Sequence, residues 1–137
     1  MQTVTPFVLY QDVAAAIEWL GRAFGFEEKL RYADDSGIVT HAELTVGDGE
    51  IFLGHPGPQY RSPRDLGTYS HLVHVYVDDV DTHYAQAVEA GATILGELED
   101  TPYGDRRYDT EDPEGQRWSF ATVLRELEPE EWGATRP

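Results

Sequence analysis

The sequence contains no cysteine among its 137 residues. This absence excludes disulfide bonds, thiolate nucleophiles and cysteine-ligated zinc. No apolar run approaches the roughly 20 residues that a membrane-spanning helix requires. The first residues, Met1–Thr5, carry neither a basic patch nor an apolar stretch of the kind found in signal peptides. We therefore expect a cytoplasmic protein that does not insert into a membrane.

Basic residues are also scarce. Ten lysines and arginines stand against twenty-six aspartates and glutamates, which gives a formal net charge of −16. A surface of this sign repels phosphate backbones and anionic lipids, so we expect neither nucleic acid nor a membrane as a partner. It would attract a cationic ligand, although the simpler interpretation is that the charge keeps the protein soluble. The chain also lacks a G-x-G-x-x-G fingerprint, a phosphate-binding loop and a serine-centred nucleophile elbow.

What the sequence does contain is an internal repeat. Val8–Val13 aligns with Val75–Val80, since each is a short apolar strand that ends in an acidic residue and a valine. Asp48–Glu50 aligns with Glu114–Gln116, at nearly the same separation along the chain. Two matches at almost one spacing indicate a duplicated module rather than a longer array of repeats.

The repeat and the local patterns predict an α+β fold built from two βαβββ modules. The modules should form a curved mixed sheet with helices on its outer face, within a single domain of residues 1–137. Asp12 and Asp79 are good N-caps for the two helices, and Gly25 and Gly91 are good terminators. The expected segments are module one at 1–55 with strands at 4–10, 26–33, 40–46 and 50–55, a linker at 56–69, module two at 70–124 with strands at 70–78, 93–98, 105–110 and 116–123, and a polar tail at 125–137.

Strand alternation then predicts which side chains share a face. Val73, Val75 and Val77 should pack under the helices, which leaves the alternate residues of that strand, Leu72, His74 and Tyr76, on the opposite face. A mixed aromatic and polar face suits a small-molecule cleft, although such a face can equally meet water or a partner subunit. We expect the cleft.

The doubled pattern resembles the vicinal oxygen chelate superfamily, which includes glyoxalase I, extradiol dioxygenases, fosfomycin-modifying enzymes and bleomycin-resistance proteins. The resemblance covers residues 4–123, and its last motifs are similar to the glyoxalase and bleomycin-resistance subgroup. One fold of this kind hosts many activities. The residues that carry the resemblance are Asp12-Val13, Ala23-Phe24-Gly25-Phe26, His41-Ala42-Glu43-Leu44, Val75-Tyr76-Val77-Asp78-Asp79-Val80-Asp81, Thr101-Pro102-Tyr103-Gly104-Asp105-Arg106-Arg107, Asp112-Pro113-Glu114-Gly115 and Trp118.

The resemblance implies four metal-ligand positions, occupied in the family by His, Glu or Gln. In this chain they correspond to Thr5, Leu53, Leu72 and Ser119. None of these side chains is a good ligand for a divalent metal, so we expect neither a metal nor another cofactor. The alternative is a metal-dependent lyase, isomerase or dioxygenase with displaced ligands, drawn from other donors that can face the cleft, namely His41, Glu43, His55 and His74.

The first hypothesis is therefore a metal-free, non-catalytic protein that sequesters a bulky aromatic natural product or peptide antibiotic, as the resemblance to bleomycin-resistance proteins implies. That resemblance also implies a homodimer. A metabolic or structural domain with no free ligand is a third possibility. Several site residues have plainer alternatives: Tyr103 and Tyr108 as core aromatics, and His41 with Glu43 as a plain ion pair. The expected ligand-binding residues are Phe7, His41, Glu43, Leu53, His55, Leu72, His74, Tyr76, Tyr103, Tyr108 and Ser119.

Overall fold

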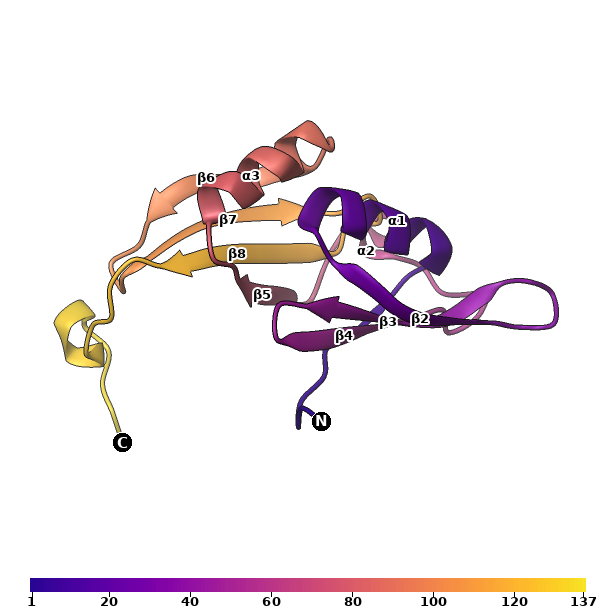
Figure 1. The fold of residues 1–137 in the computed structure, drawn as a ribbon, viewed down its shortest axis with the longest axis horizontal. Helices are drawn as coiled ribbons and strands as arrows, with labels where there is room; N and C mark the ends of the chain where they lie inside the picture. Colours follow the sequence, from indigo (N-terminus) through magenta and orange to yellow (C-terminus); the bar gives the residue numbers. More distant parts are fainter.

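Each half of the chain runs through a strand, a helix and three further strands in the computed structural model, which describes residues 1–137 (Figure 1). The βαβββ order predicted for both modules is confirmed. A short helix lies in the linker and a 3-10 turn lies near the C-terminus. The elements are β1 (Phe7–Leu9), α1 (Val13–Phe24), β2 (Glu27–Ala33), β3 (Val39–Val46), β4 (Gly49–Gly54), α2 (Pro63–Leu66), β5 (Leu72–Tyr76), α3 (Val80–Glu89), β6 (Thr93–Asp100), β7 (Asp105–Glu111), β8 (Arg117–Val123) and the 3-10 turn Pro129–Trp132.

The strands form two four-stranded mixed sheets, with orders β1-β4-β3-β2 and β5-β8-β7-β6. In each sheet the first strand pairs in parallel with the last, and the remaining pairs are antiparallel. No strand pairing joins the two sheets, so the single curved sheet expected from the sequence is in fact two. The helices α1 and α3 lie together on one side of the sheets (Figure 1). No helix combines the length and the apolar character needed to cross a membrane.

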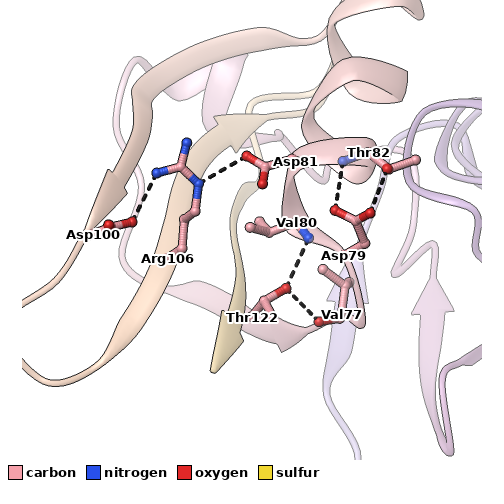
Figure 2. A network of polar contacts seen from close by, with 8 residues as sticks. All are labelled: Val77, Asp79, Val80, Asp81, Thr82, Asp100, Arg106 and Thr122. Atoms are coloured by element: carbon pink, nitrogen blue, oxygen red, sulfur yellow. Dashed lines mark hydrogen bonds and ion pairs between the residues drawn. The ribbon is translucent and has the colours of Figure 1, made fainter. Parts of the chain in front are cut away.

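Both long helices begin at the predicted caps. The Asp12 carboxylate accepts the backbone N–H of Ala15 at 3.0 Å, and Asp79 accepts that of Thr82 at 3.1 Å. Such caps satisfy amide groups that the first helical turn leaves free. Figure 2 shows how the start of α3 is fixed to β8. Thr122 accepts the Val80 N–H at 2.9 Å and donates its hydroxyl proton to the carbonyl of Val77 at 2.8 Å.

Arg106 ties α3 to β6 across the same end of module two (Figure 2). It donates to Asp81 in the first turn of α3 and to Asp100 at the end of β6, both at 2.9 Å. Since the pairs are partly exposed, solvent screening keeps their contribution to stability small.

One hydrophobic core runs under both helices and joins the modules. Phe24, at the end of α1, lies 4.6 Å from Phe120 between ring centroids, and Phe26 lies 5.4 Å from Trp118. Module one thus inserts its aromatic residues into the helix-side face of module two. Since the apolar residues of both halves form one buried cluster, we propose that residues 1–137 fold as a single domain.

A buried carboxylate holds the modules together beside this core. Asp112 accepts the hydroxyl of Tyr10 at 2.6 Å and the indole N–H of Trp118 at 3.1 Å through one oxygen. Its other oxygen accepts the backbone N–H groups of Glu114 and Gln116, each at 3.0 Å. Burial raises the pKa of Asp112, although these four donors act in the opposite direction. The same burial and the nearby carboxylate raise the pKa of Tyr10.

The structure departs from the sequence patterns at a few places. The first strand is shorter than the predicted 4–10, because Pro6 has no N–H to donate to a ladder. The linker contains α2, which begins with Pro63 and ends at Gly67. On α3, Val88 is 47% exposed although it continues the apolar pattern of this helix, whereas Val80 and Ala87 are buried.

Candidate functional site

The face of module one that points away from the helices carries an aromatic pair, in which one ring is exposed and the other is half-buried. Phe7 on β1 is 53% exposed, and its ring meets Phe52 of β4 edge-on at 5.6 Å between centroids. Gly54 makes room for that ring, since a Cβ at this position would lie 2.6 Å from Cε1 of Phe7. Phe7 was predicted from the sequence and Phe52 was not, although the register of the repeat could have indicated Phe52 because it pairs directly with Phe7.

A half-buried histidine–carboxylate pair lies beside these rings. His41 and Glu43 on β3 share this face, and Nε2 of His41 is 3.0 Å from the Glu43 carboxylate. The His41 ring lies 5.7 Å from Phe7 and 5.3 Å from Phe52. The structure therefore brings Phe7, His41 and Glu43 together as predicted. His55 lies just past β4, where Nδ1 is 3.2 Å from the carbonyl oxygen of Tyr10.

The corresponding face of module two is polar. Nδ1 of His74 on β5 lies 3.0 Å from the hydroxyl of Ser119 on β8, and Ser119 is fully buried. Burial, and secondly the positive charge of Arg107, lower the pKa of His74. Leu72, two residues before His74 on the same strand, is 47% exposed. His74, Ser119 and Leu72 thus share this face, as predicted.

Tyr76 and Tyr103 extend this polar face. Tyr76 is 58% exposed and donates its hydroxyl proton to Asp105 at 3.0 Å. Desolvation first, and then this hydrogen bond, raise the pKa of Tyr76. Arg107 donates to the Tyr103 hydroxyl at 3.0 Å and to Asp109 at 2.6 Å, which raises the pKa of its guanidinium. Separate hydrogen bonds thus fix the hydroxyl groups of both tyrosines on this face.

Two of the expected ligand-binding residues lie on the wrong side of the sheets. Tyr108 pairs with Phe120 on the helix-side face of β7, where it is 1% exposed. Its hydroxyl lies 2.6 Å from Nδ1 of His83 on α3, and burial raises its pKa. Leu53 is fully buried between Val8 and Ala42 of neighbouring strands, so it belongs to the core. In both cases strand alternation, with its period of two, decides the side.

The side chains present do not fit the metal site that the resemblance implies. No group of three or more His, Asp or Glu residues converges closely enough to hold an ion. His41 and Glu43 supply a pair of donors, and His74 bonds to a hydroxyl that is a poor ligand for a divalent ion. What the faces do offer are aromatic rings, the His41–Glu43 pair, the Arg107–Asp109 ion pair and oriented hydroxyl groups.

Comparison with known proteins identifies a family and solved structures that resemble this chain. The family model described as "Glyoxalase/Bleomycin resistance protein/Dioxygenase superfamily" matches residues 3–120. The crystal structure of TioX from Micromonospora sp. ML1 is 35% identical, with a TM-score of 0.75, over 90% of this chain and 100% of that one. A glyoxalase family protein from Bacillus cereus shares the fold at 18% identity and a TM-score of 0.70, over 91% of this chain and 95% of the other.

Relatives by sequence come from mycobacteria. The uncharacterized protein Rv0887c of Mycobacterium tuberculosis is 32% identical over 133 residues, which cover 93% of this chain and 78% of the relative. The uncharacterized protein Mb0911c of Mycobacterium bovis is also 32% identical and is covered over 88% of its length.

Proposed function

The chain belongs to the glyoxalase/bleomycin resistance protein/dioxygenase superfamily, and on that premise we propose that it binds a bulky aromatic or peptide-like natural product and sequesters it without chemical change. The observation that carries the proposal is the face of each sheet that points away from the helices. We call these the open faces: Phe7, His41, Glu43 and Phe52 in module one, and Leu72, His74, Tyr76, Tyr103 and Ser119 in module two. We expect this binding to take place in the cytoplasm, with no metal or other cofactor.

The open faces present rings rather than reactive groups. Phe7 and Tyr76 are each more than half exposed, so a planar guest can reach them without unfolding the core. A favourable aromatic pair contributes about 0.5–1.5 kcal/mol beyond the area that it buries. The net charge of −16 would attract a guest with a cationic group, which supports capture of a cationic aromatic molecule.

A homodimer is part of the same proposal. A single chain leaves Phe7, Leu72 and Tyr76 about half exposed, and β2 lies at the outer edge of its sheet with all seven residues exposed. Apolar side chains on an open sheet face favour a covering partner, and a second copy would enclose a guest between its own open faces and these. Light scattering at micromolar concentration tests this, since a monomer alone would contradict it.

Calorimetric titration with bleomycin and a panel of cationic aromatic peptides tests the sequestering function. We expect at least one member to bind, and Phe7→Ala to weaken that binding by roughly tenfold. Val88→Ala is the matched control, since Val88 is 47% exposed but lies on α3, on the helix side. If no member of the panel binds, or if both variants bind as the parent does, the open face of module one is not the guest surface.

The His41–Glu43 pair favours a second candidate, an enzyme that uses displaced ligands. A histidine held 3.0 Å from a carboxylate can relay a proton, or contribute two donors to an ion bound with further ligands from a second chain. Elemental analysis of the purified protein after dialysis separates the candidates. A divalent ion retained at one per chain, and lost in Glu43→Gln, would favour the enzyme over the sequestering protein.

A further inference from the structure

The linker that joins the modules contains two arginines that have no carboxylate partner. Seven of the ten basic side chains lie within ion-pair distance of a carboxylate, and the exceptions are Arg61, Arg64 and Arg125. Arg61 and Arg64 lie together in the linker, on either side of the buried Ser62. In a chain with a net charge of −16, two unpaired guanidinium groups so close in sequence mark a locally positive segment.

The linker borders a cavity of about 350 Å³ between α2 and the turn that joins β7 to β8. Arg64 and Tyr69 line it from the linker, and Glu111 and Arg117 line it from module two. Gly115 permits this close approach. Its φ is +84°, and a Cβ there would lie 2.7 Å from the backbone nitrogen of Arg64. That nitrogen donates to the carbonyl of Glu114 at 2.9 Å, which fixes the linker against the turn.

Arg117 is held in this cavity with part of its guanidinium group unsatisfied. Its carbon Cζ lies 3.9 Å from the centroid of the Tyr69 ring, so the ring covers one face of the guanidinium plane. Its Nε atom is buried and makes no hydrogen bond, although Oε2 of Glu111 lies 3.4 Å away. The two terminal nitrogens of Arg117 donate to no protein acceptor and, unlike Nε, are not buried, so they are the groups that can receive a planar oxyanion.

We propose that this cavity binds the carboxylate of a small aromatic acid, between Arg117 and Arg64. The lining carries two positive charges and one negative charge, so it is locally positive within an acidic molecule. A singly charged carboxylate fits better than phosphate, because the net charge of the chain repels a dianion more strongly. The carboxylate can meet the guanidinium fork of Arg117 with two parallel hydrogen bonds.

A second cavity, of about 480 Å³, adjoins the first and provides space for the aromatic body of the acid. The two share Tyr69, Thr68 and Pro63, and the second is also lined by Leu9 and Leu66. An acid whose carboxylate lies at Arg117 can therefore place its ring along Tyr69 into this apolar space. The site does not require the sequestering function proposed above, since a small acid can occupy it with the open faces empty.

Calorimetric titration of the full chain with 3-phenylpropionate tests the site, with 3-phenylpropionamide and inorganic phosphate as comparisons. We expect the acid to bind roughly tenfold or more tightly than its uncharged amide or phosphate, because only the acid combines a single negative charge with an apolar body. Arg117→Gln and Arg64→Gln should each weaken binding of the acid by roughly tenfold. Arg125→Gln is the matched control, since it removes another unpaired arginine and should leave binding unchanged.

Some outcomes overturn the inference. If the amide binds as tightly as the acid, the arginines do not recognise the charge. If phosphate binds more tightly than the acid, the site is a phosphate site rather than a carboxylate site. Should Arg117→Gln unfold the chain, Arg64→Gln alone decides, because the Arg64 side chain is exposed and makes no ion pair that the fold needs. Unchanged binding of the acid to Arg64→Gln would then contradict the proposal.

Discussion

The two modules share one backbone plan but differ in the chemistry of both sheet faces. On the helix side, module one is aliphatic at Ile51 and Leu53, whereas the equivalent positions of module two are Trp118 and Phe120. On the open side the order reverses. Phe7 and Phe52 make module one aromatic, and module two places His74 and Ser119 at the matching positions.

The two modules therefore carry their aromatic residues on opposite faces at these positions. Module two contains the aromatic centre of the core, into which module one inserts Phe24 and Phe26. Module one has aliphatic side chains under its helix and leaves two rings on its open face, where a guest can reach them. A duplicated fold can therefore place different side chains on the same face of its two copies, because strand alternation separates the helix-side face from the open face.

The largest expected effect on stability comes from truncating side chains in the hydrophobic core of each module. Phe120→Ala should lower the free energy of unfolding by about 4 kcal/mol, and Leu53→Ala, at the equivalent position of module one, by about 3 kcal/mol. Phe120 contacts aromatic rings from both modules, with centroids 4.6 Å from Phe24 and 4.1 Å from His83. Urea unfolding followed by circular dichroism measures both losses. An equal or larger loss for Leu53→Ala would show that module two is not the centre of the core.

Most of the fold could be predicted from the sequence, since its signals are local. Asp12 and Asp79 cap the helices, and the apolar periods of the two modules predicted all eight strands, with small errors at their ends. What could not be predicted depends on contacts between distant residues. No strand of module one pairs with a strand of module two, so the modules meet through side chains: Phe24 and Phe26 pack on module two, and Asp112 bonds to Tyr10, which is far away in sequence.

The candidate site was predicted less completely, because a residue's face depends on exact register. Phe7, His41, Glu43 and His74 were placed correctly from strand alternation. Tyr108 was misplaced because its hairpin is rich in charged residues and seemed exposed, although alternation puts it opposite Phe120. Leu53 was assigned to the cleft face through an error of one residue in β4, where Phe52 is the residue on that face, and such a slip moves every side chain to the other face.

Phe7 and His74 occupy equivalent positions on the two open faces. Replacing each by the other should change the free energy of unfolding less than the core variants do, and by different amounts in the two modules. His74→Phe should cost about 1–3 kcal/mol of unfolding free energy, because it leaves the hydroxyl of the fully buried Ser119 without its partner. Phe7→His should change stability by less than about 0.5 kcal/mol, because Phe7 is 53% exposed. Urea unfolding measures both.

The double variant His74→Phe with Ser119→Ala is the control for that exchange. Removing the orphaned hydroxyl should restore most of the loss, since replacing both partners of a hydrogen bond by apolar groups is nearly neutral. If the double variant is no more stable than His74→Phe alone, the loss comes from the bulk of the new ring and not from the polar pair. The polar face of module two would then not depend on this hydrogen bond.

The smallest expected effect is a loss of stability in mild acid, and it too should reside in module two. Burial lowers the pKa of His83, whose Nε2 donates to the carbonyl of Phe24 at 3.0 Å and whose Nδ1 accepts the Tyr108 hydroxyl. Burial also lowers the pKa of His74. An unfolded histidine titrates near pH 6.5, so below that pH the unfolded chain binds more protons than the folded chain, and stability falls as the pH falls. The fall ends once the folded histidines are themselves protonated.

Two measurements examine this acid sensitivity. The urea midpoint should be lower at about pH 5 than at about pH 7.5, and His83→Gln should reduce the difference, because glutamine does not titrate. Nuclear magnetic resonance titration of the ring protons should place the midpoints of His83 and His74 below the unfolded value of about 6.5. A midpoint of His83 above that value would mean that its contacts favour the charged ring. The hydrogen bond from His83 on α3 to the carbonyl of Phe24 at the end of α1 would then strengthen in acid. In that case His83 would not make module two less stable at low pH.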